Sequence, residues 1–406
     1  MTPRAITGLG IVSALGIGRD AFFAAMRAPV LVADLPRHAP STFDASKFPD
    51  AQLAEVNDFD PAKYLGDKGL RSLDRLTKLL VVAARLSMHD GGFKKDNVYV
   101  QSGPQQIGVC ISNAYGSLEA ITELDRVAML EDARYINPSK FPNTVANSAS
   151  GYVSIWEDLR ALNVSVSDGN CGALDTIACG DIYLETGRAD ALLVGGAEAM
   201  SEALYLAFHR LGALDTGNAP SDSVSPIRGT RLGEGAVLMV MEPLELASAR
   251  GAHVFAEVTG YGTSFVAPES EASLIHPSSK AVENAMRAAL ADAGIAPREI
   301  DVVASSVSGL RMFDCAELSA IERVFGPDVC VAGPKAVLGE TLGAGGAMAM
   351  AATMAWFDDA PPCAIVRGAV RAPGSKGVRN VLVSAMGFYG NASAVVMRRP
   401  GAAEAR

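Results

Sequence analysis

One stretch near the middle of the chain constrains the fold more than any other. Residues 166–175 read Val-Ser-Asp-Gly-Asn-Cys-Gly-Ala-Leu-Asp, and residues 187–198 read Gly-Arg-Ala-Asp-Ala-Leu-Leu-Val-Gly-Gly-Ala-Glu. The first segment predicts a strand that ends at Asp168-Gly169 and turns into a helix reaching about Gly187. The second predicts a buried strand closed by Gly195-Gly196, where backbones can approach closely. Such a unit holds one side chain at a helix N-terminus, which suits a nucleophile.

The remaining pattern predicts two α/β halves of similar order, residues 1–245 and 246–406. The first half opens with a buried strand at Ala5–Ser13 and adds strands at 107–111 and 236–241. The second half is expected to contain strands at 253–260, 300–305, 329–332, 379–384 and 392–397, and helices at 279–293, 316–325 and 343–357. Strands that alternate with helices favour the α/β fold class.

Composition excludes several kinds of protein. The chain has 406 residues, 49% of them hydrophobic, which is enough for a large globular core. No run reaches the ~18 apolar residues of a membrane span and no signal-peptide pattern is present, so we expect a cytoplasmic protein. A net charge of −10 argues against binding to nucleic acid. The six cysteines lack metal-binding spacing and Gly8-Leu-Gly10 is no dinucleotide fingerprint, so we expect reduced thiols, no metal and no cofactor.

Several motifs together resemble the β-ketoacyl synthases of the thiolase-like superfamily. They are the opening strand, the turn within residues 166–175, the Gly-Gly-Ala-Glu strand end, the segments Asp314-Cys-Ala-Glu317 and Gly333–Gly345, and the loop Gly387–Gly390. The resemblance covers nearly the whole chain. It implies a five-layer α/β/α/β/α sandwich made of two similar halves.

The catalytic positions of that family are altered in this chain. By the resemblance, Asn170 takes the place of the nucleophilic cysteine, Ser306 and Glu340 take the places of two histidines, and Lys335 is retained. Condensation needs a thiolate nucleophile and imidazole N–H groups that stabilise the enolate formed by decarboxylation. An amide is not usefully acylated, serine is too short to replace imidazole, and a carboxylate repels an enolate. The substitutions therefore indicate that condensation is lost.

Within the family, Asn-Cys-Gly-Ala-Leu-Asp is most similar to the chain-length-factor subunits of type II polyketide and aryl polyene synthases. This implies a non-catalytic subunit that pairs with an active ketosynthase α subunit and shapes the tunnel in which a polyketide or polyene chain grows. Acyl carrier protein is expected to dock mainly on that partner. The resemblance also assigns tunnel and interface positions: Tyr115 to the turn that closes the acyl pocket, Lys140, Phe141 and Thr144 to a loop that crosses the dimer interface, and Phe388 and Tyr389 to a glycine-rich loop that Tyr389 stiffens.

Other interpretations stay open. An active acyltransferase or malonyl decarboxylase could use Cys171 with Glu340 and Lys335, although Cys171 lies one residue after the nucleophile position. One residue turns a side chain by about 100° on a helix, which favours a structural role for this cysteine. Asn170 could simply cap the helix, and Glu340 could be an exposed acid at a helix start. A self-paired pseudoenzyme that only binds acyl thioesters is a third possibility.

Overall fold

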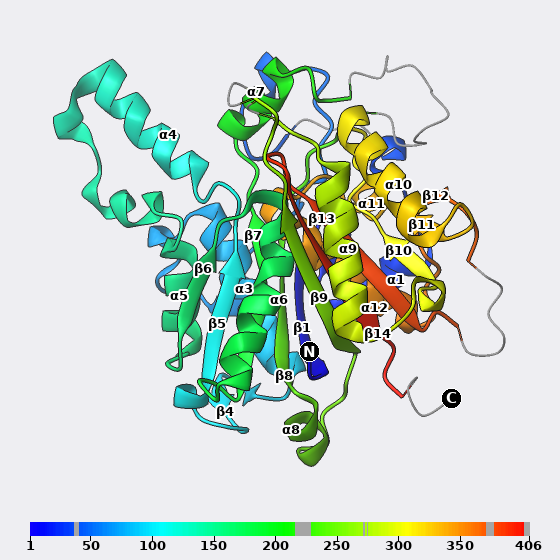
Figure 1. Ribbon diagram of the computed structural model, residues 1–406. Helices are drawn as coiled ribbons and strands as arrows, with labels where there is room; N and C mark the ends of the chain where they lie inside the picture. The colour runs from blue at the N-terminus through cyan, green and yellow to red at the C-terminus, as the bar shows by residue number, and fades with distance from the viewer. Residues whose placement is uncertain (36–39, 216–228, 271–272, 274, 371–376, 402–406) are drawn as a thin grey trace.

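A large mixed sheet runs through the whole molecule, and helices cover it on both sides (Figure 1). The computed structural model describes residues 1–35, 40–215, 229–270, 273, 275–370 and 377–401. Within them the sheet has the strand order β12-β11-β10-β13-β14-β9-β1-β8-β7-β5-β6, with β2 attached to β1.

The N-terminal half forms one side of this sheet in the order β6-β5-β7-β8-β1. Strand β5 runs parallel to β6 and β7, and β8 runs antiparallel to β7 and β1. The bounds are β1 (Arg4–Ser13), β5 (Ile107–Ser112), β6 (Asn163–Val166), β7 (Ala191–Glu198) and β8 (Gly235–Pro243). Strand β2 (Gly16–Ile17) pairs with the end of β1, and β3 (Lys94–Lys95) and β4 (Val98–Tyr99) form a separate hairpin.

The C-terminal half repeats this order as β11-β10-β13-β14-β9. Strand β10 runs parallel to β11 and β13, and β14 runs antiparallel to β13 and β9, so each pairing has its counterpart in the first half. The bounds are β9 (Ala256–Phe265), β10 (Val302–Ala304), β11 (Cys330–Ala332), β12 (Ile365–Arg367), β13 (Asn380–Met386) and β14 (Asn391–Arg398). The repeat confirms the predicted α/β fold of two similar halves.

The two halves of the sheet are joined at one place, where Arg4–Ile6 of β1 pair with Ala256–Val258 of β9. The resulting sheet is continuous in its hydrogen bonding, although its two sides belong to different halves of the chain. The division between residues 245 and 246 stays a prediction.

Alternate strand residues face different cores, and this alternation produces the layers. In the N-terminal half, Leu193 and Leu238 face the outer helices, whereas Val194 and Met239 face the central helices. In the C-terminal half, Val396 packs in the other outer core and Val395 in the same central core. One central core is therefore shared by both halves, as the five-layer sandwich requires.

Helix α12 occupies the central layer, where all its residues from Gly345 to Phe357 are buried. A helix without a polar face fits only a site that is enclosed on every side. Helix α6 packs against it, α3 and α5 cover the N-terminal half, and α9 and α10 cover the C-terminal half. The helices are α1 (Arg19–Arg27), α2 (Ala62–Leu65), α3 (Arg75–Asp90), α4 (Leu118–Val127), α5 (Ser148–Glu157), α6 (Gly172–Glu185), α7 (Glu202–Arg210), α8 (Leu244–Ala249), α9 (Ser279–Ala293), α10 (Arg311–Phe325), α11 (Lys335–Leu338) and α12.

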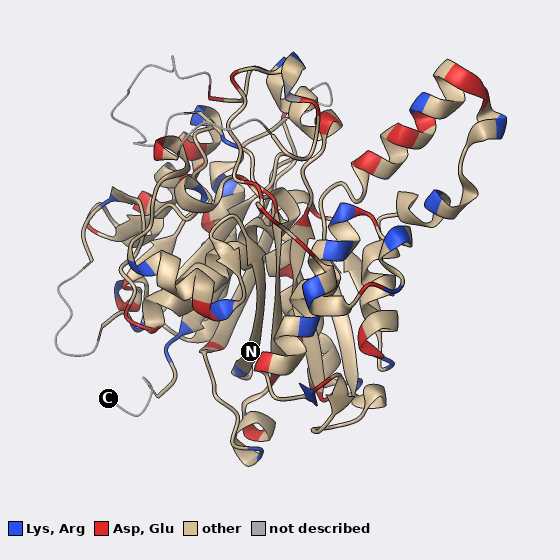
Figure 2. Ribbon diagram, turned by 180° about the vertical axis from the view of Figure 1, so that it is seen from behind, with Lys and Arg blue, Asp and Glu red and all other residues tan. Residues whose placement is uncertain are grey.

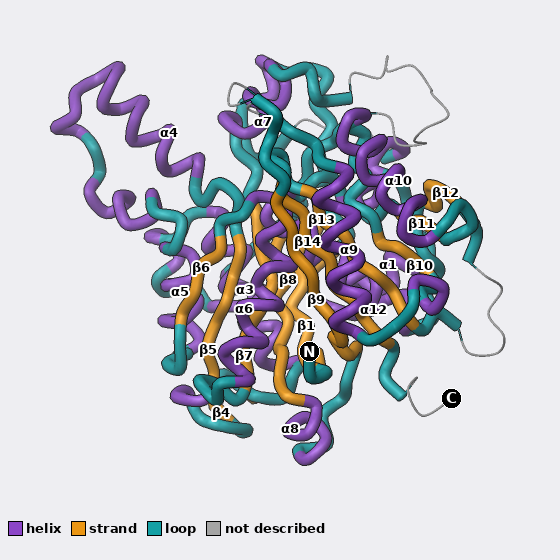
Figure 3. Tube along the Cα trace, viewed as in Figure 1, coloured by secondary structure: helices purple, strands orange, loops and turns teal. Residues whose placement is uncertain are grey.

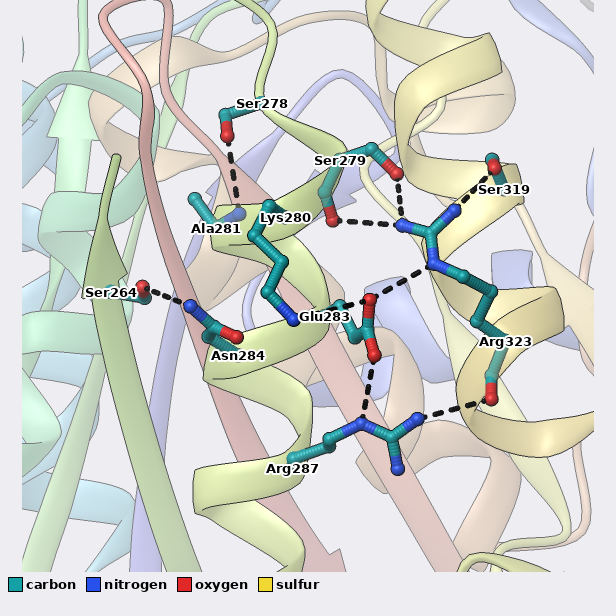
Figure 4. A network of polar contacts seen from close by, with 10 residues as sticks. All are labelled: Ser264, Ser278, Ser279, Lys280, Ala281, Glu283, Asn284, Arg287, Ser319 and Arg323. Carbon is teal, nitrogen blue, oxygen red and sulfur yellow. Dashed lines mark hydrogen bonds and ion pairs between the residues drawn. The ribbon is translucent and has the colours of Figure 1, made fainter. Parts of the chain in front are cut away.

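A polar network ties the two outer helices of the C-terminal half together (Figure 4). Glu283 of α9 accepts a hydrogen bond from Arg323 Nε of α10 at 2.9 Å and another from Arg287 Nε at 3.0 Å. Arg323 also donates to Ser319 Oγ, and the carboxylate lies between the two guanidinium groups. Surface ion pairs contribute little stability one by one, so this network mainly orients α10 on α9.

Residues 118–144 form an arm that extends away from the layered body (Figures 1 and 3). The arm consists of α4, a π-helical turn at Ala128–Asp132 and 3₁₀ turns at Ala133–Tyr135 and Pro138–Thr144. Charged residues of both signs line it (Figure 2). Helix α5 and strand β6 lie on the same side of the molecule as the arm (Figure 1).

None of the helices in the described part of the chain has both the length and the apolar character that crossing a bilayer requires.

Candidate active site

The turn predicted at residues 168–175 is a 3₁₀ turn, Gly169–Cys171, that leads directly into α6. Close packing holds it in place, because a Cβ atom at Gly172 would lie 2.2 Å from Ser112 Oγ at the end of β5. Asn170 is buried here, and its Oδ1 finds no hydrogen-bond partner among the described residues. The interpretation of Asn170 as a helix cap is therefore wrong, since a cap must accept a backbone N–H.

Cys171 packs in the central core that both halves share. Its side chain is fully buried, and Sγ donates a weak hydrogen bond to the carbonyl oxygen of Ala385 at 3.6 Å. Burial raises the pKa of the Cys171 thiol well above its ordinary value, and the nearby carboxylates of Asp175 and Asp168 raise it further. Reactive cysteines need an exposed, electropositive environment that stabilises the thiolate. This environment is the opposite, and it favours a structural thiol.

A second turn, at Leu342–Ala344, leads into α12 in the same way as the first leads into α6. The two turns contact each other, so the starts of the two central helices meet at one place. Glu340 lies just before the second turn and is 1% exposed. Its carboxylate accepts a hydrogen bond from Lys335 Nζ at 2.6 Å and one from the backbone N–H of Leu342 at 2.9 Å. The alternative of an exposed acid at a helix start is therefore wrong.

Ser306 is held by the buried carboxylate of Glu317. The backbone N–H of Ser306 donates to Glu317 Oε1 at 2.9 Å, and its hydroxyl donates to Oε2 at 2.7 Å. Burial raises the pKa of Glu317, while the positive charge of Lys335 partly opposes this rise. Lys335 also acts on Asp314, whose pKa burial raises to about 7. Lys335 therefore pairs directly with Glu340, and its charge acts at longer range on Asp314 and on Glu317, the hydrogen-bond partner of Ser306.

Glu198, at the end of the Gly-Gly-Ala-Glu strand, is a site residue whose role the sequence analysis missed. It is fully buried and accepts hydrogen bonds from the backbone N–H groups of Ala114 at 2.8 Å and Gly343 at 3.2 Å. Burial raises its pKa to about 7. The carboxylate thus connects the turn after β5 with the turn before α12. The only signal in the sequence was an acid at the end of an apolar strand.

Two tyrosines from different loops meet near this region. Tyr115 follows β5 and Tyr389 lies between β13 and β14, and the Tyr389 side chain is near enough to affect the Tyr115 hydroxyl. Burial raises the pKa of Tyr115 to about 12, with smaller contributions from Tyr389, Glu198 and Glu340. Tyr115 is 38% exposed. The family resemblance assigned Tyr115 to the turn that closes the acyl pocket and Tyr389 to the glycine-rich loop, but it did not predict that the two lie close together.

The other predicted positions lie in two separate places. Phe388 packs edge-on against Phe313 and Phe208, with ring centroids 5.3 and 6.2 Å apart, so the glycine-rich loop is anchored in an aromatic cluster. Lys140, Phe141 and Thr144 lie on the arm: Lys140 Nζ pairs with Glu123 at 2.5 Å, Thr144 Oγ1 donates to the Phe141 carbonyl at 2.8 Å, and the Phe141 ring is 65% exposed.

The structure therefore brings Asn170, Glu340 and Lys335 to the region where the two helix starts meet, whereas Ser306 is held by Glu317. Among the described residues, no group of three or more His, Cys, Asp or Glu side chains is arranged to hold a metal ion.

The repeated halves and the paired helix-start turns define a thiolase-like ketosynthase fold. The family model for the β-ketoacyl synthase N-terminal domain matches residues 1–247, and the model for the C-terminal domain matches residues 255–360. The chain belongs to the β-ketoacyl synthase family.

Similar proteins agree with this assignment. The 3-oxoacyl-[acyl-carrier-protein] synthase 2 of Coxiella burnetii is 33% identical over 84% of this chain and 83% of its own length, and that of Vibrio cholerae is 30% identical over 88% and 86%. Among solved structures, the ishigamide ketosynthase/chain length factor has 25% identity and a TM-score of 0.83, covering 98% of this chain and 100% of the other. A β-ketoacyl synthase from Burkholderia phymatum has 26% identity and a TM-score of 0.85 with the same coverage. The fold also matches a type II polyketide synthase ketosynthase in complex with its acyl-carrier protein, AntDE:AntF, at 20% identity and a TM-score of 0.77, over 98% of this chain and 99% of the other.

Proposed function

We propose that this chain is a non-catalytic, chain-length-factor-like subunit that pairs with an active ketosynthase and shapes the tunnel for its growing polyketide or polyene product. The observation that carries the proposal is the buried ion pair between Lys335 and Glu340, at a position where the family resemblance expects a histidine. A histidine N–H would stabilise an enolate, but a carboxylate already bonded to an ammonium group offers no such donor.

The other two positions support the same conclusion. Asn170 presents a carboxamide at the turn before α6. Ser306 already directs its hydroxyl and backbone N–H to Glu317. A condensing enzyme needs a nucleophile next to a base that can accept its proton. The buried thiol of Cys171, with its raised pKa, is a poor substitute. No observation favours the alternative of an active acyltransferase or malonyl decarboxylase that uses Cys171.

Two features support a partner of the same fold. Strand β6 is the last strand on its side of the described sheet, and β5 is its only partner there. Exposed apolar residues flank this edge, Ile155 on α5 and Ile182 on α6. An unpaired strand edge beside apolar side chains is a surface that another sheet can extend.

The arm supplies a second apolar surface on the same side. Met129 and Leu130 at its tip are 81% and 77% exposed, and Tyr135 and Phe141 are also exposed. An active ketosynthase α subunit has the matching architecture, and the similar ishigamide structure is described as a ketosynthase/chain length factor. Acyl carrier protein, seen with the ketosynthase in AntDE:AntF, would then act mainly on the active partner.

The experiment that tests the catalytic part of this proposal is an acylation assay. The purified chain is incubated with acyl and malonyl thioesters of an acyl carrier protein, and its intact mass is measured. We expect no acyl adduct and no loss of the malonyl carboxyl group. A Cys171→Ala variant is the matched control. An adduct that forms on the native chain and disappears in Cys171→Ala would overturn the proposal and establish the acyltransferase alternative.

A further inference from the structure

Glu198 is a buried carboxylate that bonds no cation among the described residues. Three other buried carboxylates, Glu157, Glu234 and Glu242, each pair with an arginine. The hydrogen-bond partners of Glu198 in the described part of the chain are instead backbone N–H groups. Burying a carboxylate is costly unless hydrogen bonds satisfy it. The contacts of Glu198 with the backbone are therefore what this side chain is held by, and what it holds.

The register of the sheet explains which backbone the carboxylate meets. Strand β7 pairs with β5 as far as Ser112, the last residue of β5, and then continues two residues further to Glu198. The chain that leaves β5 turns at this level. Glu198 Oε2 accepts a hydrogen bond from the backbone N–H of Ala114 at 2.8 Å, and Oε1 accepts one from that of Tyr115 at 3.4 Å. The carboxylate therefore binds the backbone of the turn that contains Tyr115.

The same carboxylate joins this turn to the start of α12. Its Oε2 also accepts a hydrogen bond from the backbone N–H of Gly343 at 3.2 Å, so one oxygen is shared by two turns. The turns pack closely, because a Cβ atom at Gly343 would lie 2.4 Å from the backbone nitrogen of Ala114. Asn113 Nδ2 donates to the carbonyl oxygen of Ala146 at 2.9 Å. The backbone of the turn is therefore held at several points, although Tyr115 itself is 38% exposed.

We propose that Glu198 is a positioning residue for product length: its carboxylate holds the Tyr115 turn against the start of α12 and so fixes the place of the Tyr115 ring at the end of the tunnel. The inference rests on the proposed function, because it needs a tunnel that Tyr115 closes. A glutamine at this position has only one acceptor oxygen. If that oxygen keeps the contacts with Ala114 and Gly343, the NH₂ group faces the N–H of Tyr115, donor against donor, and the turn loses this contact.

Amide hydrogen exchange tests the positioning without a partner. The isolated full-length chain is followed at about pH 8, where the carboxyl group of Glu198 is largely ionised because its pKa is about 7. We expect Glu198→Gln to speed exchange in the peptide that covers residues 113–117 on the order of tenfold, as the loss of a hydrogen bond allows. Glu242→Gln changes a buried carboxylate at the opposite end of β8 and should leave this peptide unchanged. Unchanged exchange in Glu198→Gln would overturn the proposal.

Product length tests the consequence of the positioning. Each variant is expressed together with the partner ketosynthase, and product lengths are measured by mass spectrometry. We expect Glu198→Gln to raise the share of longer products several-fold, because a ring that is no longer held leaves space for more of the chain. A merely structural defect would lower the yield without changing length. Glu198→Gln/Tyr115→Ala should give the same lengths as Tyr115→Ala alone, since no ring remains to be positioned.

The combined results separate this proposal from the proposed function. A change in length for Tyr115→Ala but not for Glu198→Gln would overturn the positioning role, and so would further lengthening in the double variant. If neither single variant changes length while Glu198→Gln speeds exchange, Glu198 holds the turn but the tunnel ending at Tyr115 is wrong. If Glu198→Gln does not fold, Glu198→Asp takes its place. Its side chain keeps the charge but is one carbon shorter, so we expect the same two results.

Discussion

Lys335 and Glu340 form a buried ion pair whose disruption should cost considerable stability. The Lys335 side chain is 10% exposed and that of Glu340 only 1%, so neither charge can be solvated if its partner is removed. Breaking a buried pair by removing one member typically costs about 3 to 5 kcal/mol, whereas replacing both members is far less costly.

We therefore expect Lys335→Met to lower the free energy of unfolding by about 3 to 5 kcal/mol in chemical denaturation. The double variant Lys335→Met/Glu340→Leu should recover most of this loss, because no uncompensated charge remains. The Arg323→Met variant, which breaks surface contacts of Glu283, is a control that should cost about 1 kcal/mol or less. A loss of the same small size for Lys335→Met would show that water reaches Glu340.

Tyr115 and Tyr389 each lie on a turn that connects a strand to the next element. If the partner's tunnel runs along the shared interface, the Tyr115 ring acts as a wall, since a packed interior admits another carbon unit only where there is space. Tyr115→Ala, expressed together with the partner ketosynthase, should lengthen the product by one or two two-carbon units.

Product length is measured by mass spectrometry. Because Tyr115 is partly exposed, its truncation should cost less than the ~3 kcal/mol typical of a fully packed aromatic ring. Tyr115→Phe loses the hydroxyl but keeps the ring, so it should leave product length unchanged. Unchanged length in Tyr115→Ala, with the heterodimer intact, would remove Tyr115 from the tunnel.

The arm allows a direct test of pairing. Met129→Asp together with Leu130→Asp places two charges on the exposed apolar tip, and burying unpaired charges in an interface is costly. We expect the variant to lose copurification with the ketosynthase, while the melting temperature of the isolated chain stays within a few degrees of the native value. Val98→Asp changes a residue of similar exposure on the β3–β4 hairpin and should leave pairing intact. Equal copurification of both variants would exclude the arm tip from the interface.

Most secondary-structure elements could be predicted because their signals are local. The apolar period over residues 279–293 matches α9, and the Ala- and Met-rich run before Phe357 matches α12. The site was harder to predict because its contacts join distant residues. The family resemblance identified Asn170 and Glu340 as altered positions, but nothing in the sequence indicated that Lys335 neutralises Glu340 or that Ser306 binds Glu317.

For the whole molecule, several buried acids should make stability depend on pH. Burial raises the pKa of Glu198 from its ordinary value of 4.5 to about 7, and those of Asp175 and Asp314 from 3.8 to about 7. At pH values between the ordinary pKa and the raised pKa, these carboxyl groups keep their protons in the folded chain but have lost them in the unfolded chain. Each group therefore lowers the free energy of unfolding as pH rises through this window, by up to about 1.4 kcal/mol per pH unit.

The measurement is urea denaturation at several values from about pH 5 to pH 7.5. We expect the native chain to lose stability as pH rises, and Glu198→Gln to show a shallower decrease because a neutral amide replaces one titrating group. Identical slopes for both proteins would mean that Glu198 stays ionised throughout the range.

The position of β1 has a consequence for how the chain folds as it is made. All ten residues of β1 are buried, and apart from the two-residue strand β2 its neighbours in the sheet are β8, which begins at Gly235, and β9, which begins at Ala256. On a ribosome, β1 therefore waits for its two long partners, β8 and β9, until more than 200 further residues have been synthesised. Such long-range pairing is slow to form. During this interval β1 is an apolar segment without a sheet, which makes it the natural place for a chaperone to hold the nascent chain.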